Sequence, residues 1–144
     1  MLLVKKIRKN AVLPTVAHAN EDMAYDLRCS EPATIPAKGF CAVPTGIAVQ
    51  YKNVLGKACG LKVEGRSSLA MDGIFTFAGV LDSGFVGEVV VFLGNMSDKD
   101  KYFYESDKIA QIVPHSELAD EVKEVKEFPL SGKRGEKGFG SSGV

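Results

Sequence analysis

Short apolar and β-rich runs recur along the chain and are separated by turn signals. Within Leu61–Glu64, apolar and polar residues alternate, as they do in a strand with one buried face. Many short strands at this spacing predict an all-β barrel or sandwich in preference to an α/β fold. The predicted strands are Leu2–Arg8, Tyr25–Cys29, Cys41–Val43, Gly46–Tyr51, Lys57–Val63, Ile74–Phe77, Val80–Asp82, Glu88–Leu93 and Ile109–Val113.

Helical signals are confined to one short segment. Ser67–Met71 is predicted to form a single short helix, with Ser67 as its N-cap residue. Leu118–Phe128 combines a helical apolar stripe with many valines and glutamates, and we expect it to be mainly extended. The last segment, Ser131–Val144, contains five glycines and cannot pack a core, so it is predicted to be a mobile tail. These features predict one domain over residues 1–130 and a flexible tail over residues 131–144.

Composition and charge limit the class of protein. A chain of 144 residues with 45% apolar content is expected to form one folded domain. The 18 Lys and Arg residues balance 18 Asp and Glu residues, so a broad basic face for nucleic acid is not expected. No apolar run approaches the roughly 20 residues of a membrane helix, and the first lysines follow the first apolar residues, unlike those of a signal peptide. We therefore expect neither a nucleic acid nor a membrane as partner.

The chain has three cysteines, and none of them forms a C-x-x-C pair with another. This spacing argues against a zinc site or a redox couple and favours three reduced thiols. Reduced thiols predict a cytoplasmic or other reducing intracellular compartment.

Two segments combine an arginine with small hydroxyl residues and flexible backbone. Arg66 directly precedes Ser67 and Ser68, and Arg134 precedes the glycines and serines of the tail. A guanidinium group offers a planar fork of donors, and hydroxyls and closely approaching amides add more, which together suit a phosphate group. The alternatives are a surface loop for the first segment and a disordered tail for the second.

Two carboxylates and one amide occupy positions that need an explanation. Asp82 stands just before a Ser-Gly turn in Gly79–Glu88, a segment predicted to be a hairpin, and it either caps the turn or orients and deprotonates a water molecule. Asp26 lies inside an apolar strand, which a salt bridge or the water shell of a metal ion would explain. Gln111 lies in the middle of a strand and is either an outward-facing polar residue or a ligand.

Several enzyme classes lack their sequence signatures in this chain. His18 and His115 have no carboxylate or nucleophile at an informative spacing, and no nucleophile elbow is present. The sequence also contains no Walker loop and no dinucleotide-binding fingerprint. A covalent hydrolase and a P-loop enzyme are therefore disfavoured.

Five segments follow one another along the chain: Ala24–Leu27, Arg66–Ala70, Gly79–Glu88, Asp107–Gln111 and Arg134–Gly143. Their order resembles the five motifs of the all-β, usually trimeric deoxyuridine triphosphatase (dUTPase) family, over nearly the whole chain. The resemblance implies a jelly-roll-like β-clip protomer that hydrolyses dUTP to dUMP and pyrophosphate with Mg²⁺ as cofactor. It also implies a homotrimer with three active sites at the subunit interfaces.

The resemblance implies a role for each residue by its position. Asp82 would orient and activate the water that attacks the α-phosphorus, and Gln111 would help to hold that water or the nearby phosphate. Asp26 would bind the water shell of the Mg²⁺ ion. Phe85 would pack against the deoxyribose and leave no room for a 2′-hydroxyl, while the backbone of Thr76–Asp82 would read the uracil edge. The implied substrate-binding set is Arg66, Ser67, Ser68, Thr76, Gly79, Val80, Leu81, Phe85, Arg134, Phe139, Gly140, Ser141 and Ser142.

The tail has its own implied role, which is to close over bound substrate and exclude water. Arg134, Ser141 and Ser142 would hold the terminal phosphate, and Phe139 would cover the base. Lys137 stands where the family has a glycine, which affects the geometry of this clasp.

The chain also departs from the family pattern elsewhere. Ala24 and Ser68 each replace a usual glycine, and Ser83–Val86 replaces the commoner Asp-Tyr-Arg ending. The related dCTP deaminases share the fold, but their catalytic glutamate would fall at Phe92, where this chain has no carboxylate. A deaminase or a bifunctional relative is one alternative, and a non-catalytic nucleotide-binding protein on the same fold is another.

Overall fold

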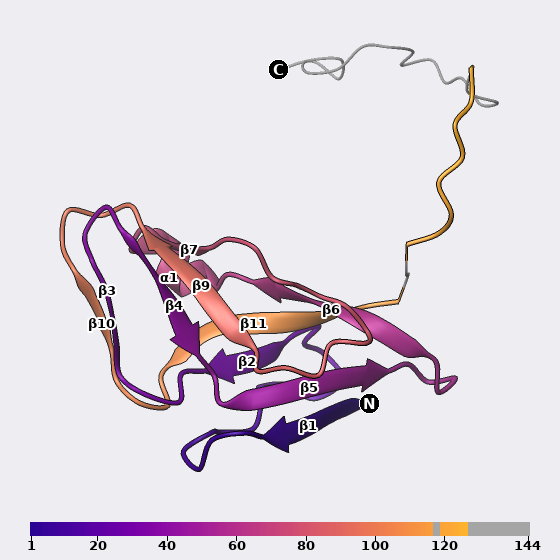
Figure 1. Cartoon of the computed structure of the whole chain (residues 1–144). Helices are drawn as coiled ribbons and strands as arrows, with labels where there is room; N and C mark the ends of the chain where they lie inside the picture. The colour runs from indigo at the N-terminus through magenta and orange to yellow at the C-terminus, as the bar shows by residue number, and fades with distance from the viewer. Residues whose placement is uncertain (117–118, 127–144) are drawn as a thin grey trace.

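The computed structural model of the chain describes residues 1–116 and 119–126, and it builds this part almost entirely from strands (Figure 1). Eleven strands and one short helix are present in the described residues. None of the helices there is long and apolar enough to cross a membrane. In chain order the elements are β1 (Leu2–Lys6), β2 (Tyr25–Arg28), β3 (Ala33–Ile35), β4 (Phe40–Pro44), β5 (Ile47–Lys52), β6 (Ala58–Glu64), α1 (Ser67–Met71), β7 (Ile74–Thr76), β8 (Val80–Leu81), β9 (Val90–Asn95), β10 (Lys101–Phe103) and β11 (Lys108–His115).

The strands form three antiparallel sheets. The largest has the order β1-β5-β6-β11-β2, and β8 is attached to β6. The second has the order β4-β9-β7, and β10 pairs with β3 in a two-stranded ribbon at one end of the molecule (Figure 1). All of the pairings between these strands are antiparallel, and apart from β5 with β6 they join strands that do not follow one another in the chain.

The core lies between the inner faces of the sheets. On β9, Val91 and Leu93 are buried whereas Phe92 points outward, as the two-residue period of a strand requires. Leu27 on β2 and Ile112 on β11 are fully buried in the same hydrophobic cluster. The core therefore joins the strands that carry the predicted site to the β4-β9-β7 sheet.

Asn95, at the end of β9, is a buried polar residue with a complete set of partners. Its side-chain Nδ2 donates to the carbonyls of Ile35 (3.0 Å) and Lys99 (2.8 Å), and its Oδ1 accepts from the backbone and hydroxyl of Ser97. These bonds tie β9 to β3 and to the turn that leads into β10. Because each polar atom is satisfied, burial of this amide does not destabilise the fold.

The predicted strands occur, and two more were missed. Ala33–Ile35 and Lys101–Phe103 have three residues each and lie among prolines and charged residues, so neither gives a periodic signal. They become strands because they pair with each other. The first strand ends at Lys6, before the predicted Arg8, because the amides of Ile7 and Arg8 both donate to the Gly46 carbonyl.

The helix occurs at the predicted residues, but the prediction that Ser67 is its N-cap is wrong. Arg66 occupies the N-cap position with extended backbone, and its carbonyl accepts from the amides of Leu69 and Ala70. Ser67 is the first helical residue, and no side chain caps the helix. In the segment 118–128, predicted to be mainly extended, the described residues 119–126 form neither helix nor strand.

The predicted hairpin over Gly79–Glu88 is also wrong, although its turn is present. The Phe85 amide donates to the Asp82 carbonyl (2.9 Å), which closes the turn. The strands on either side do not pair with each other, because β8 pairs with β6 and β9 lies between β4 and β7. Gly79 directs β8 onto β6: its φ of +126° is accessible to glycine, and a Cβ there would lie 2.7 Å from Cβ of Val63.

Candidate active site

Asp26 on β2 is the centre of a small charged cluster. Its carboxylate pairs with the ammonium of Lys108 (2.6 Å) and with Nε of Arg66 (3.4 Å), and its side chain is only 14% exposed. The cluster joins β2 to the start of β11 and to the residue that precedes α1. Of the two explanations expected for an acid in this strand, the structure shows the salt bridge.

Gln111 lies directly opposite Asp26 in the strand pairing and also opposite Glu64 on β6. Its Nε2 donates to the carbonyl of Gly65 (2.8 Å), so it holds the end of β6 next to Arg66. The Arg66 guanidinium in turn donates to the Lys108 carbonyl (3.4 Å). Gln111 is therefore part of the cluster and not a freely solvated polar residue.

Lys108 is the member of this cluster that the sequence did not single out. In a regular strand, Lys108 and Gln111 would point to opposite faces of the sheet because they are three residues apart. The register of β11 against β2 shifts between Lys108 and Ala110, and this irregularity brings both side chains to the face of Asp26. A bulge of this kind leaves no mark in the alternation pattern, so only the strand register reveals it.

The charged cluster lines an open cavity of about 770 Å³. Residues 17, 18 and 21–24 also line it, and there the His18 amide donates to the Asp22 carboxylate (2.8 Å) and lowers the pKa of that carboxyl. The polar lining includes Asp22, Asp26, Arg66, Ser67, Lys108 and Gln111.

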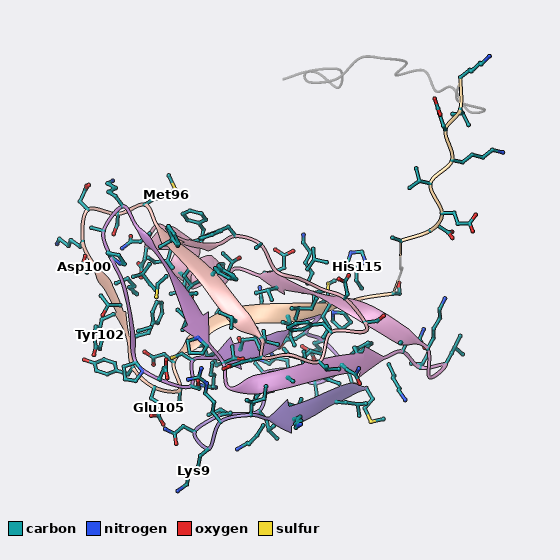
Figure 2. The ribbon with its side chains drawn as sticks, viewed as in Figure 1. Lys9, Met96, Asp100, Tyr102, Glu105 and His115 are labelled. Carbon is teal, nitrogen blue, oxygen red and sulfur yellow. The ribbon has the colours of Figure 1, made fainter. Side chains whose placement is uncertain are left out.

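Asp82 lies apart from this cluster. Leu81 pairs with Leu61, which places Asp82 beside Gly60, at a cavity that also includes Lys62 and His115; Figure 2 shows His115 where the chain leaves the sheet. Arg66 follows Gly60 by six residues along an extended backbone. At roughly 3.3 Å per residue, about 20 Å separates the two positions. One copy of the chain therefore does not bring Asp82 and Arg66 together.

The remaining predicted residues fall into three groups. Ser67 and Ser68 are exposed in the first turn of α1, beside the charged cluster. The segment Thr76–Asp82, called the arm below, contains Thr76, Gly79, Val80 and Leu81. Phe85 follows the arm and is 40% exposed. The predicted residues of the tail lie outside the described part of the chain: Arg134, Phe139, Gly140, Ser141 and Ser142.

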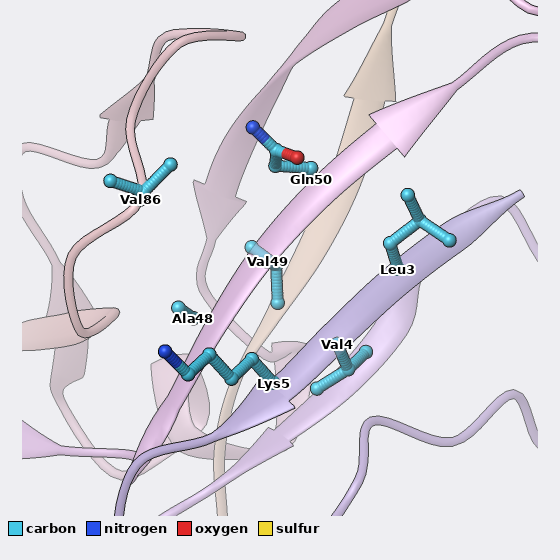
Figure 3. A pocket seen from close by; sticks show the side chains of 7 residues that line it. All are labelled: Leu3, Val4, Lys5, Ala48, Val49, Gln50 and Val86. Atoms are coloured by element: carbon cyan, nitrogen blue, oxygen red, sulfur yellow. The ribbon is translucent and has the colours of Figure 1, made fainter.

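Another cavity, of about 400 Å³, is lined by residues of β1 and β5 (Figure 3). Val86 faces it from the loop after the Asp82 turn, and Leu3, Val4 and Val49 supply apolar surface. None of the residues predicted to bind substrate lines this cavity. Its lining contains no carboxylate and one ammonium group, that of Lys5, so it lacks the chemistry of the charged cluster.

Comparison with known proteins assigns the family. A family model described as dUTPase matches residues 9–143. The chain belongs to the dUTPase family. Among curated relatives, the deoxyuridine 5′-triphosphate nucleotidohydrolase of Oryza sativa subsp. japonica is 37% identical over 145 residues, covering 100% of this chain and 81% of that protein. The enzyme of the same name from Paramecium bursaria Chlorella virus 1 is 36% identical, covering 99% of this chain and 98% of its own.

The fold agrees with this family. The dUTPase of Staphylococcus bacteriophage 80alpha, in a structure with dUpNHpp, is 26% identical and superposes with a TM-score of 0.87, covering 100% of this chain and 99% of that one. The all-β, β-clip fold with one short helix is therefore confirmed. The segments Ala24–Leu27, Arg66–Ala70, Gly79–Glu88 and Asp107–Gln111 contribute to the two regions described above, the charged cluster and the arm that carries Asp82.

Proposed function

We propose that this chain hydrolyses dUTP to dUMP and pyrophosphate, a reaction that limits uracil in DNA and supplies dUMP for dTMP synthesis. The observation that carries the proposal is the cluster of Asp26, Arg66, Lys108 and Gln111 beside the exposed serines of α1, in a member of the dUTPase family. Phosphoryl transfer needs charge neutralisation and one aligned water more than covalent chemistry. The cluster supplies the first of these, and Asp82 supplies the second.

The roles follow from the chemistry of each side chain. Arg66 and the hydroxyls of Ser67 and Ser68 bind the phosphate oxygens. Gln111 uses Nε2 on the Gly65 carbonyl, which leaves Oε1 to accept a hydrogen bond from a water molecule. Asp82 accepts one proton of that water while the water oxygen bonds to the α-phosphorus. The bond from the α-phosphorus to the bridging oxygen breaks, and pyrophosphate leaves.

Magnesium fits the charged cluster through Asp26. Mg²⁺ in nucleotide sites is commonly bound by one or two carboxylates together with substrate phosphates and waters. Asp26 lines the large cavity, and its carboxylate pairs with Arg66. When bound, the ion would neutralise charge on the phosphate oxygens, and Asp26 would hold it through its water shell.

The separation of Asp82 from Arg66 supports active sites shared between copies of the chain. We propose a homotrimer, in which Asp82 of one copy reaches the charged cluster of the next. The outer face of the β4-β9-β7 sheet provides apolar surface for this contact. Four phenylalanines gather there, with neighbouring ring centroids 5.8 to 6.1 Å apart and exposures of 39% to 68%. They are Phe40, Phe75, Phe77 and Phe92.

The tail completes the proposed site. Residues 131–144 close over bound nucleotide, with Arg134, Ser141 and Ser142 on the terminal phosphate and Phe139 over the base. The sequence of the tail supports this step, because one arginine, one aromatic residue and three serines stand there among five glycines.

The dCTP deaminase alternative needs a carboxylate at position 92. Phe92 stands there and packs against Phe77 on the apolar face, with 6.0 Å between ring centroids. A carboxylate is also missing from the neighbouring positions Val91 and Leu93, which are buried in the core. These observations favour the hydrolase.

Pyrophosphate release from dUTP, dCTP, dTTP and UTP, each with Mg²⁺ and with chelator, tests the proposal. We expect dUTP to be preferred by at least about 10²-fold. Backbone groups of Thr76–Asp82 that pair with uracil are left unpaired by cytosine, and Phe85 leaves no room for the 2′-hydroxyl of UTP. Ammonia release from dCTP would identify a deaminase, and nucleotide binding without turnover would identify a binding protein. Asp82→Asn should lower kcat by at least about 10²-fold while nucleotide binding survives.

A further inference from the structure

Gly87 lies against the ring of Phe85. A Cβ atom built on Gly87 would stand 2.7 Å from Cζ and 2.9 Å from Cε2 of that ring, distances at which one of the two must move. The same loop contains a second glycine, Gly84, where an added Cβ would meet nothing within 4 Å. Neither glycine has a positive φ. The backbone of the loop therefore does not require glycine at position 87, whereas the present position of the ring does.

The ring of Phe85 can move at little cost to the fold. It is 40% exposed, and the atoms that approach Gly87 are at the far end of the side chain. An added methyl group would therefore displace the ring and leave the core unchanged, because exposed side chains relocate where packed ones cannot. Position 87 thus controls where the ring lies more than it controls stability.

We propose that Gly87 is a positioning residue for sugar selection: it lets the Phe85 ring lie close to the loop backbone, in the place from which it packs against the deoxyribose of the substrate. This inference rests on the proposed function, in which Phe85 packs against the deoxyribose. A ring held in that place fills the volume that a 2′-hydroxyl would occupy. A ring displaced by a side chain at position 87 leaves that volume open and lets UTP compete with dUTP.

The test measures kcat/KM for dUTP and for UTP in four proteins: wild type, Gly87→Ala, Phe85→Ala and the double variant. A Gly84→Ala variant serves as the matched control, since it adds the same methyl group to the same loop in open space. We expect the dUTP/UTP ratio to fall by about tenfold or more in Gly87→Ala, because steric rejection of one hydroxyl is worth on the order of 10². Gly84→Ala should keep the wild-type ratio.

The double variant decides whether Gly87 acts through Phe85. Once the ring is removed, a methyl group at position 87 has nothing to displace, so the double variant should match Phe85→Ala alone. Thermal melting should give similar Tm values for wild type, Gly84→Ala and Gly87→Ala. A residue that served only the fold would lower Tm and leave the ratio unchanged.

Three results would overturn the inference. They are an unchanged dUTP/UTP ratio in Gly87→Ala, an effect of Gly87→Ala that persists without the Phe85 ring, and loss of folding in Gly87→Ala that Phe85→Ala does not relieve. Each is distinct from failure of the proposed function, in which the wild-type protein itself would not release pyrophosphate from dUTP.

Discussion

Two inactive variants should restore activity to each other if each active site takes Asp82 from one copy and Arg66 from another. Asp82→Asn removes the carboxylate that orients the water, and Arg66→Ala removes a guanidinium of the charged cluster. Each variant assembled alone has the same defect in every site. In a mixed assembly, some sites combine a wild-type Asp82 with a wild-type Arg66 from the neighbouring copy.

The separation of Asp82 from Arg66 in the structure determines how much activity a mixed assembly should recover. Because Asp82 lies beside Gly60 and Arg66 follows six residues later, about 20 Å of strand separates them within one copy. With equal amounts of the two variants and random assembly, half of the Asp82 positions and half of the Arg66 positions are wild type. About one quarter of the sites are then intact, whatever the number of copies in the closed ring. Sites built within one chain would give no intact site at all.

The assay is pyrophosphate release from dUTP after the two variants, each with a different affinity tag, are co-expressed and purified through both tags. Each variant purified alone should have at most about 1% of wild-type kcat, the low end for loss of a general base. Every mixed trimer, whether it holds one or two copies of a given variant, has one intact site out of three, so the doubly tagged sample should approach one third of the wild-type rate per chain. Activity of the mixed sample no higher than that of the separate variants would refute the shared site. A double variant, Asp82→Asn with Arg66→Ala, mixed with wild type provides the calibration.

Asp26→Asn should lower the free energy of unfolding by about 2 kcal/mol, between the values for exposed and buried pairs, because Lys108 loses its partner. Urea unfolding at fixed protein concentration measures this loss. The control Asp98→Asn, which breaks an exposed pair with Lys38, should leave the free energy of unfolding almost unchanged. Equal losses in the two variants would contradict the expected role of the buried pair. Asn95→Ala should cost about 3 kcal/mol in the same measurement, since the buried Ile35 carbonyl and the partly buried Lys99 carbonyl lose their donor. A wild-type midpoint would show that water replaces the amide. Removal of residues 133–144 should leave Tm unchanged and reduce kcat for dUTP sharply, so a truncated protein at full rate, or an unfolded one, would exclude the clasp.

The sequence by itself determined the class of fold and three of the four residues of the charged cluster. Apolar residues in short runs between turns specify strands because the two faces of a strand alternate, and this local property survives in β2, β5, β6 and β11. The short helix after Arg66 follows in the same way from local preferences. Asp26, Arg66 and Gln111 could be selected because their types are unusual where they stand: an acid in an apolar strand, a scarce arginine before two serines, and an amide in mid-strand.

Only the tertiary structure decided how these residues meet. The register shift in β11 brings Lys108 to the face of Asp26, and the pairing of β8 with β6 replaces the expected hairpin and sets Asp82 apart from Arg66. The ribbon of β3 and β10, likewise, exists because two weak segments pair with each other. Strand register and pairing partners depend on contacts between segments distant in the chain. Local patterns of polarity therefore do not predict which strands pair or in which register. The sequence therefore determines which residues are available for the chemistry, and the packing of the sheets decides which of them share a site.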